Sequence, residues 1–400
     1  MNKFVKNRLH NFLVYNIFSL TFLGYYVVLL LTLNAGLDGV SRQITIPLRL
    51  LLGLGIILLF IINFKQGRPF LKWFFLFSLL YFLRIFLDYI QLKSIHISYV
   101  NLIFYFISFC FIPFIGLSKI NFWKINFNKL FNYFLVAAFS FSFLSNLFYG
   151  RYVGKVSRLY TSIVNESVVS PLILSYCSSL IIGVNITYLL FNKISNLKKI
   201  FCVTIISMSL IPFFLGASTG SLLAILFPFT IIYFSRISIV NTIKFLGLIL
   251  IFIIIIYNIG IYFKSGLFNR LMEKSEMLDS STRTYMWGSA LRQFGNNPIF
   301  GDKITNDYQN FYPHNVGLEV LQSLGILGFL PFIYLIIKAF KACKKIFKFH
   351  KSLAWFPILF LQAFIQSMFS GALYSSAWLW SSLALLLSLD LYLNKKRKFL

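Results

Sequence analysis

The residues best suited to chemistry in this sequence stand together in YPHNVGLE, at 312–319, where a polar stretch gives way to an apolar one. The chain has four histidines, and His314 is the one in this stretch. An imidazole titrates near neutral pH, so it can accept a proton from an attacking hydroxyl or donate a hydrogen bond to phosphate. Asn315 is a good N-cap for a helix that begins at Val316, and the positive end of a helix favours an anion. The alternative is a surface histidine at the start of a helix.

A second candidate lies upstream in SSTRTYMWGSALRQF, at 280–294, which has the pattern of a short amphipathic helix. Ser280 or Ser281 is its expected N-cap, and Gly295 stands just past its expected end. Helical spacing puts four residues on one side, which we expect to face the apolar interior. These residues are Arg283, Trp287, Ala290 and Phe294.

The arginine on this face is the one with a chemical interpretation. A planar guanidinium suits phosphate oxygens, so Arg283 is a candidate anion ligand, whereas Arg292 points to the opposite side of the helix. The alternative is that Arg283 snorkels or pairs with Asp279, four residues earlier.

Glu319 lies just inside the apolar run, and an ionisable group at that depth is a functional candidate by default. Pairing with an arginine of another helix, such as Arg49 or Arg84, explains it equally well. Arg84 and Asp88 are four residues apart, which predicts a local ion pair with a structural role.

The composition identifies the elements that must position these residues. The chain has 400 residues, of which 58% are hydrophobic and 12% charged, so it has too little polar surface to cover a soluble globule. Apolar runs near the spanning length recur from end to end, and the first is too long for a signal peptide. The sequence therefore predicts an all-α, polytopic integral membrane protein forming one domain over 1–400.

Hydropathy gives about 12 spans, joined by short connections and two longer ones. The predicted spans are 11–33, 44–63, 70–91, 97–118, 129–149, 168–191, 200–216, 219–235, 241–262, 316–337, 352–371 and 373–393. The two longer connections are 150–167 and 263–315, the latter between spans 9 and 10 and carrying five of the ten acidic residues.

The distribution of Lys and Arg sets the expected orientation. Every second connection is basic, and these connections with the termini hold 24 of the 37 Lys and Arg and none of the acids. Positive residues stay on the cytoplasmic side, so both termini should be cytoplasmic and both longer connections periplasmic, in a bacterial inner membrane. The same clustering at membrane borders argues against a nucleic-acid partner for the net charge of +27.

The connection at 150–167 breaks this rule. It carries Arg151, Lys155 and Arg158 against one acid, Glu166, although basic residues normally avoid the outer side. Phosphate binding explains such a cluster, although short outer loops tolerate some basic residues.

Several chemistries have no support in the residues. The sequence contains no Walker A loop, GxGxxG, HExxH or GxSxG motif. The four cysteines include no CxxC pair, so we expect neither a disulfide framework nor a metal site, and no cofactor is indicated. An outward-facing site also lacks access to cytoplasmic nucleotides, so group transfer there needs a membrane-borne, activated donor such as a lipid-linked diphosphate.

The pieces from Arg283 to Leu330 resemble the signature region of the O-antigen polymerase and O-antigen ligase superfamily. That pattern is an Arg, a Trp shortly after, an NPIFG-like turn, and His-Asn before a GILG helix. Here the pieces are Arg283, Trp287, NPIFG at 297–301, His314-Asn315 and GILG at 325–328.

Two further pieces match upstream. Arg158 and Asn165 fit the family's Arg and the Asn that opens the next span, and Ser218-Thr219-Gly220 fits a turn in which the family has Arg where this chain has Thr219. The resemblance covers about 150–328 and implies an inverting, metal-independent glycosyltransferase. Its partners would be an undecaprenyl-diphosphate-linked oligosaccharide, membrane lipid and a chain-length regulator.

By this resemblance, Arg158 and Arg283 would hold the donor diphosphate, and His314 would be a base or a further diphosphate contact. Arg151, Asn165, Trp287, Asn315 and Glu319 are the expected substrate-binding residues.

Three functions remain open, and the polymerase is favoured. A polymerase transfers a growing chain from undecaprenyl diphosphate to a lipid-linked repeat unit, whereas a ligase transfers the finished chain to a lipid A core with the same leaving group. A flippase for lipid-linked oligosaccharides should keep its charged residues along a cavity inside the spans, and here they gather in the outer loops.

Overall fold

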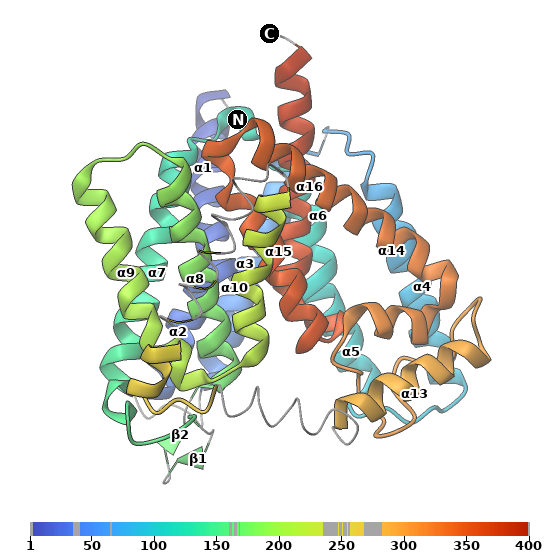
Figure 1. Ribbon diagram of the computed structural model, residues 1–400. Coiled ribbons are helices and arrows are strands. Elements are labelled where there is room, and N and C mark those ends of the chain that lie inside the picture. Colours follow the sequence, from blue (N-terminus) through green and yellow to red (C-terminus); the bar gives the residue numbers. More distant parts are fainter. Residues whose placement is uncertain are drawn as a thin grey trace. The chain divides into compact units, whose positions relative to one another are not determined.

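The computed structural model of the protein describes most of the chain and consists mainly of helices (Figure 1). The described residues are 3–34, 41–64, 66–159, 162–163, 166–167, 169–234, 247, 250, 254, 257–267 and 282–398. They divide between two compact units, each described here by itself. Unit 1 is Met1–Leu54, Ile125–Glu273 and Cys343–Gln362, and unit 2 is Gly55–Lys124, Lys274–Ala342 and Ala363–Leu400.

The helices bear out the prediction of a membrane protein. Within the described residues, eight helices are long and apolar enough to cross a membrane, at the first seven predicted spans and the tenth. Shorter apolar helices, Thr219–Tyr233 and Trp355–Phe369, match the eighth and eleventh predicted spans, and Ala377–Lys398 lies over the twelfth. The ninth, 241–262, falls mostly outside the described residues, so the total of 12 stays a prediction.

Unit 1 is built from long helices with one small antiparallel hairpin of two-residue strands. Its elements are α1 Lys3–Ser19, the π-helical turn η1 Leu20–Gly24, α2 Tyr25–Asn34, α7 Phe127–Tyr149, η4 Gly150–Tyr152, β1 Ser162–Ile163, β2 Glu166–Ser167, α8 Pro171–Phe191, α9 Asn196–Gly216, α10 Thr219–Phe234 and η5 Lys351–Leu353. Three helices contribute to both units: α3 Ser41–Ile62, α14 Val316–Phe349 and α15 Trp355–Phe369.

The helix starts in unit 1 follow from capping residues in the sequence. Asn126 accepts a hydrogen bond from the N–H of Lys129 to cap α7, and Ser195 accepts one from Lys198 to cap α9. Pro171 begins α8, where its missing N–H costs nothing.

The interior of unit 1 centres on α8, which packs against α7, α9 and α10. Its buried serines donate their hydroxyls to backbone carbonyls. Ser178 donates to Leu174 at 2.7 Å, so these serines add little polarity to the core. Gly216 lets α9 approach closely, because a Cβ there would lie 2.4 Å from the carbonyl oxygen of Pro171. The predicted short turn between α9 and α10 is confirmed, with Ala217 in the left-handed conformation.

Unit 2 contains α4, α5, α6, α13 and α16 and carries most of the predicted chemistry. Its elements are α4 Leu71–Ile90, α5 Tyr99–Phe106, the π-helical turn η2 Ile107–Phe111, α6 Ile112–Ser118, η3 Phe122–Lys124, α13 Thr282–Asn296, η6 Leu373–Ser375 and α16 Ala377–Lys398. Its aromatic core includes Phe74 and Phe114, whose ring centroids lie 3.8 Å apart, with Trp380 against both.

The predicted tenth span, 316–337, differs from the structure in two ways. The helix continues to Phe349, so it includes five of the lysines that we assigned to a cytoplasmic connection. It is also broken at Gly325, which has φ 58° and ψ −158°, and Figure 1 shows the resulting bend in α14. A residue with a side chain rarely adopts such backbone angles, so the break explains why a glycine stands there.

The NPIFG turn at 297–301 fills this break. The N–H of Ile326 donates to the carbonyl of Pro298 at 2.8 Å, and that of Leu327 donates to Ile299 at 3.2 Å. These N–H groups would otherwise be orphans inside an apolar segment, where each unpaired group is costly. The NPIFG and GILG motifs therefore form one structural unit, which we call the glycine joint: the turn at 297–301 bonded to the break in α14 at Gly325.

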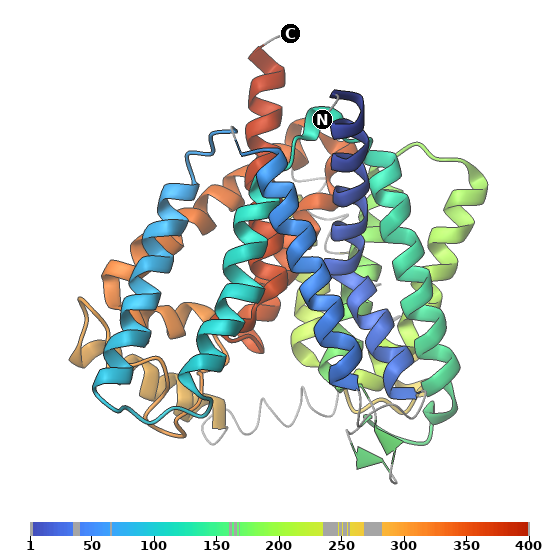
Figure 2. The ribbon, with the colours of Figure 1, turned by 180° about the vertical axis from the view of Figure 1, so that it is seen from behind.

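In each unit, the terminal helix and the polar loops lie at opposite ends (Figures 1 and 2). Within unit 1, the start of α1 lies opposite the β1–β2 hairpin, and within unit 2 the end of α16 lies opposite α13.

Candidate functional site

The helix predicted at 280–294 is confirmed as α13, Thr282–Asn296. It runs on through Gly295, which we expected just past its end, and the expected caps Ser280 and Ser281 lie outside the described residues. Its buried face was predicted with a rotational error. The fully buried residues are Met286, Ser289, Ala290 and Gln293.

Arg283 and Trp287 therefore flank the buried face of α13 rather than forming it. Both are half-buried, and Arg292 is exposed, as expected. A guanidinium at this border keeps part of its surface free, which a ligand-binding arginine needs.

Trp287 ties α13 to the segment that precedes α14. Its indole N–H donates to the carbonyl of Pro313 at 2.9 Å. Trp287 is one helical turn from Arg283, and Pro313 precedes His314, so this one bond brings the two chemically active residues to the same part of unit 2. This bond occupies the indole N–H. A substrate could accept a hydrogen bond from that N–H only if the bond to Pro313 were broken.

His314 occupies a strained backbone conformation at the start of α14. Its φ of 57° is in the left-handed region, which costs free energy for a residue other than glycine and is enriched at functional sites. Next to it, Asn315 caps α14 as predicted, with its side-chain oxygen accepting from the N–H of Leu318 at 3.1 Å. The imidazole therefore lies at the positive end of a helix.

The electrostatics of His314 suit a base. Burial lowers the pKa of the imidazole below its ordinary value of 6.5, and the positive charge of Arg283 lowers it further. The side chain is therefore neutral at pH 7. Within the described residues, its Nδ1 is buried and has no hydrogen-bond partner, an arrangement that folded proteins normally avoid.

Glu319 is fully buried one turn into α14, and its hydrogen-bonded contact is not an arginine. Its Oε2 accepts from the N–H of Leu373 at 2.8 Å, and Arg84 of the same unit bonds the NPIFG turn, so the alternative pairing of Glu319 with Arg84 is wrong. Its Oε1 has no hydrogen-bond partner within the described residues. Glu319 therefore anchors η6, the short helix that carries Tyr374.

Sequence analysis missed a group of rings around His314, which we call the histidine cluster: His96, Phe311, Tyr312, His314 and Tyr374. His96 Nε2 and the Tyr374 hydroxyl are 3.1 Å apart. The Phe311 ring centroid lies 4.4 Å from that of His96 and 5.5 Å from that of His314. These residues come from three distant segments, and the sequence around His96 and Tyr374 carries no local signal that pairs them.

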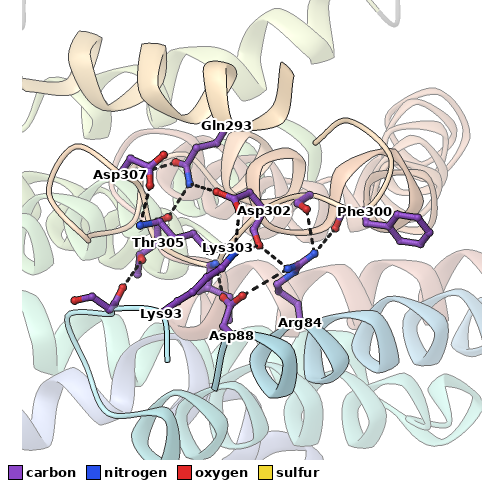
Figure 3. Close-up of polar contacts among 12 residues, drawn as sticks. Arg84, Asp88, Lys93, Gln293, Phe300, Asp302, Lys303, Thr305 and Asp307 are labelled. Atoms are coloured by element: carbon purple, nitrogen blue, oxygen red, sulfur yellow. Dashed lines mark hydrogen bonds and ion pairs between the residues drawn. The ribbon is translucent and has the colours of Figure 1, made fainter. Parts of the chain in front are cut away.

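A second polar group, the carbonyl clamp, consists of Arg84, Asp88, Lys93 and Asp302 (Figure 3). The guanidinium of Arg84 donates to the carbonyls of Phe300, at 2.8 Å, Gly301 and Asp302. The predicted ion pair with Asp88 is confirmed at 3.5 Å. The clamp thus holds the end of the NPIFG turn against α4.

The clamp continues into the loop that follows the turn. Lys93 and Asp302 pair at 2.8 Å, and Figure 3 shows Gln293 of α13 between Asp302 and Asp307. Burial alone would raise the pKa of Asp302, but hydrogen bonds from Lys93 and Gln293 outweigh it and hold that pKa below its usual value. The clamp therefore fixes α13 as well as the turn.

The predicted residues of the shorter loop belong to unit 1. Arg158 is half-buried, and its Nε donates to the carbonyl of Gly216 at 3.2 Å, which ties this loop to the turn before α10. Arg151 is exposed, with its guanidinium 5.0 Å from the Tyr152 ring centroid. Asn165 lies outside the described residues. Unit 2 brings together Arg283, Trp287, His314, Asn315 and Glu319.

Comparisons of the chain with models of protein families, with curated proteins and with solved structures gave no match. The apolar helices define the class of protein directly: it is a helical integral membrane protein. Among the residues that the structure describes, no group of three or more His, Cys, Asp or Glu could hold a metal ion.

Proposed function

We propose that this protein is an O-antigen polymerase. In this proposal it transfers a growing glycan from undecaprenyl diphosphate to a lipid-linked repeat unit on the periplasmic face of the inner membrane. The observation that carries the proposal is that Arg283 lies near enough to lower the pKa of His314 at the start of α14, with the bond from Trp287 to Pro313 joining their two segments. These residues are also the ones through which the sequence resembles that superfamily.

The reaction is a single displacement. The acceptor hydroxyl oxygen bonds to the anomeric carbon of the donor sugar, the bond from that carbon to the diphosphate breaks, and undecaprenyl diphosphate leaves with the electron pair. The hydroxyl proton passes to the imidazole of His314, which is neutral at pH 7 because burial and Arg283 lower its pKa. Arg283 and the N-terminus of α14 stabilise the negative charge of the leaving group.

Arg158, Arg151 and Asn165, in the loop of unit 1, keep the substrate-binding roles that the sequence resemblance implies. Asn315 supports the site by capping α14, and Glu319 by anchoring η6. No cofactor or metal is required, because the leaving group is already activated.

The proposed orientation places both termini in the cytoplasm. It is supported by the basic connections and by the opposite ends of terminal helices and polar loops within each unit. Gln309→Cys and Lys344→Cys test it, because both positions are exposed and the four native cysteines are buried. An impermeant thiol reagent added from outside should label position 309 and not 344, and the reverse would overturn the orientation.

Deletion of the gene followed by gel analysis of surface glycolipid tests the activity. A polymerase deletion leaves lipid A core carrying one repeat unit. Loss of a ligase leaves bare core with polymer on the lipid carrier, and loss of a flippase leaves bare core without polymer. Either of the last two patterns would replace the proposal, and an unchanged polymer would remove it.

A further inference from the structure

The histidine cluster offers ring surface beside the proposed catalytic histidine. The Tyr312 ring lies between the two imidazoles, with its centroid 4.5 Å from that of His314 and 5.8 Å from that of His96. His96, Phe311, Tyr312 and His314 are each half-buried, whereas Tyr374 is only 6% exposed and supports them from within. Each of these four residues therefore keeps part of its surface exposed.

The polar atoms of the cluster add hydrogen-bonding capacity at the same place. Burial, with a smaller effect from the charge of Glu319, raises the pKa of the Tyr312 phenol to about 12, so it stays a hydrogen-bond donor at neutral pH. The neutral imidazole of His314 adds one N–H donor and one acceptor nitrogen. Apolar ring faces with a few fixed polar groups are the usual lining of small-molecule sites.

A sugar ring matches this surface. Its faces of C–H groups pack on aromatic rings, and its hydroxyls need donors and acceptors at the ring edges. A diphosphate does not match it, because the ring faces are apolar.

We propose that the histidine cluster binds the acceptor sugar, with Phe311 and Tyr312 packing on the sugar ring and Tyr312 and His314 hydrogen-bonding its hydroxyls. This inference rests on the proposed function. It assigns the donor diphosphate to the Arg283 side of His314 and the acceptor to the His96 side. His96 is then a positioning residue that holds Phe311 and Tyr374 in place.

The test uses the full-length protein in lipid nanodiscs and kinetics at varied acceptor concentration. The donor is the growing glycan on undecaprenyl diphosphate and the acceptor is the lipid-linked repeat unit, both extracted from the source cells. Tyr312→Ala should raise the KM for the acceptor about tenfold, the loss expected for one packed aromatic contact, and leave the KM for the donor within about twofold. Tyr312→Phe, which keeps the ring, should have an intermediate effect.

The matched control is Tyr308→Ala. Tyr308 is 47% exposed on the same loop and stacks on Tyr285 at 5.7 Å, outside the histidine cluster. This variant should leave both KM values unchanged. An unchanged acceptor KM in both Tyr312→Ala and His96→Ala, with both variants folded, would overturn the proposal.

A binding measurement separates this inference from the proposed function. The probe is the oligosaccharide freed from its lipid by mild acid, with contact to the protein measured by saturation-transfer NMR. Binding that is lost in Tyr312→Ala but kept in Tyr308→Ala supports the sugar site even if the protein does not polymerise. No binding to the wild-type protein, or equal binding to both variants, rejects the sugar site, whatever the gel analysis shows.

Discussion

Unit 2 contains two polar groups that use similar residues in opposite ways. In the carbonyl clamp, Arg84 faces three backbone carbonyls and Asp88, and Lys93 faces Asp302. In the histidine cluster and its neighbour Arg283, the arginine has no ion pair among the described residues, and Nδ1 of His314 has no hydrogen bond there. Buried polar atoms are normally paired. In the clamp, Nε of Arg84 and Oδ1 of Asp88 also lack hydrogen-bond partners among the described residues, but other polar atoms of both residues are bonded.

In our proposal, this difference separates residues that hold the fold from residues that bind a ligand. The partners of the clamp are backbone groups of the NPIFG turn, which in turn fills the break in α14. The histidine cluster stands at the start of the same helix, on a backbone that the clamp has fixed. Arg84 is committed to the backbone of the turn, whereas Arg283 has no ion pair among the described residues; Asp279, its alternative partner, lies outside them.

The largest expected effect is loss of glycan transfer when Arg283 or His314 is removed. Arg283→Ala or His314→Ala should lower the transfer rate by about 100-fold or more, the usual cost of losing a charge-stabilising donor or a general base. The measurement is polymer formation in a deletion strain, with membrane insertion checked by blotting. Arg292→Ala, on the exposed side of α13, is the matched control and should be mild. Full activity in Arg283→Ala would end the diphosphate assignment.

Removing the clamp arginine should instead cost stability. Arg84→Ala leaves Asp88 as a buried charge without its arginine, which costs about 3–5 kcal/mol. The comparison variant is Lys303→Ala, which breaks a pair with the exposed Asp307 worth at most about 1 kcal/mol. Thermal unfolding in detergent measures both. Equal shifts in Tm for Arg84→Ala and Lys303→Ala would mean that the carbonyl clamp does not stabilise the fold.

The glycine joint should respond to a single added methyl group. Gly325→Ala puts a Cβ 2.5 Å from the carbonyl oxygen of Ile299 at a positive φ, and the strained backbone alone costs about 1–3 kcal/mol. Gly295→Ala, in α13 with open space around it, should stabilise the protein by about 0.5–1 kcal/mol. Unfolding curves of the two variants should move in opposite directions, and a stabilised Gly325→Ala would contradict the joint.

The smallest expected effect is a dependence of stability on pH. Burial, followed by Arg283, lowers the pKa of His314, and burial lowers that of His96, below the ordinary 6.5. The unfolded chain therefore binds protons first, so stability falls as pH drops from about 6.5 through the folded pKa values and is flat above that range.

Arg283→Gln tests the cause of this dependence. Without that charge the pKa of His314 should move back toward 6.5, which weakens the fall in Tm between pH 7 and pH 5. Arg292→Gln should leave the fall unchanged. If Arg283→Gln has the same pH profile as the wild-type protein, then the arginine does not act on His314.

The sequence predicted the local features of the site well. Capping chemistry located the start of α14 at Val316, because an asparagine side chain bonds the N–H groups of the first turn wherever the helix packs. Helical spacing located α13 and the Arg84–Asp88 pair, because both depend on residues within a few positions of one another. The buried face of α13 was predicted about one residue away from the observed one, because the residues that pack on a helix decide which face is buried.

The partners of Glu319 and His96 could not be predicted from the sequence either, because packing between distant segments sets them. Glu319 accepts a hydrogen bond from the backbone N–H of Leu373. Nearly every residue has such an N–H, so the residue type at this position does not identify the partner. His96 meets Phe311 and Tyr374 across long stretches of chain, so no spacing rule connects them.

By itself, the sequence determined that the chain is a helical membrane protein, where most helices begin, and which residues could do chemistry. These properties follow from composition, periodicity and neighbours along the chain. Only the tertiary structure decided that NPIFG closes the break at Gly325, that Arg84 is bound up in the fold, and that His314 is left unpartnered among the described residues beside His96. Those outcomes depend on which distant segments meet, and packing sets them.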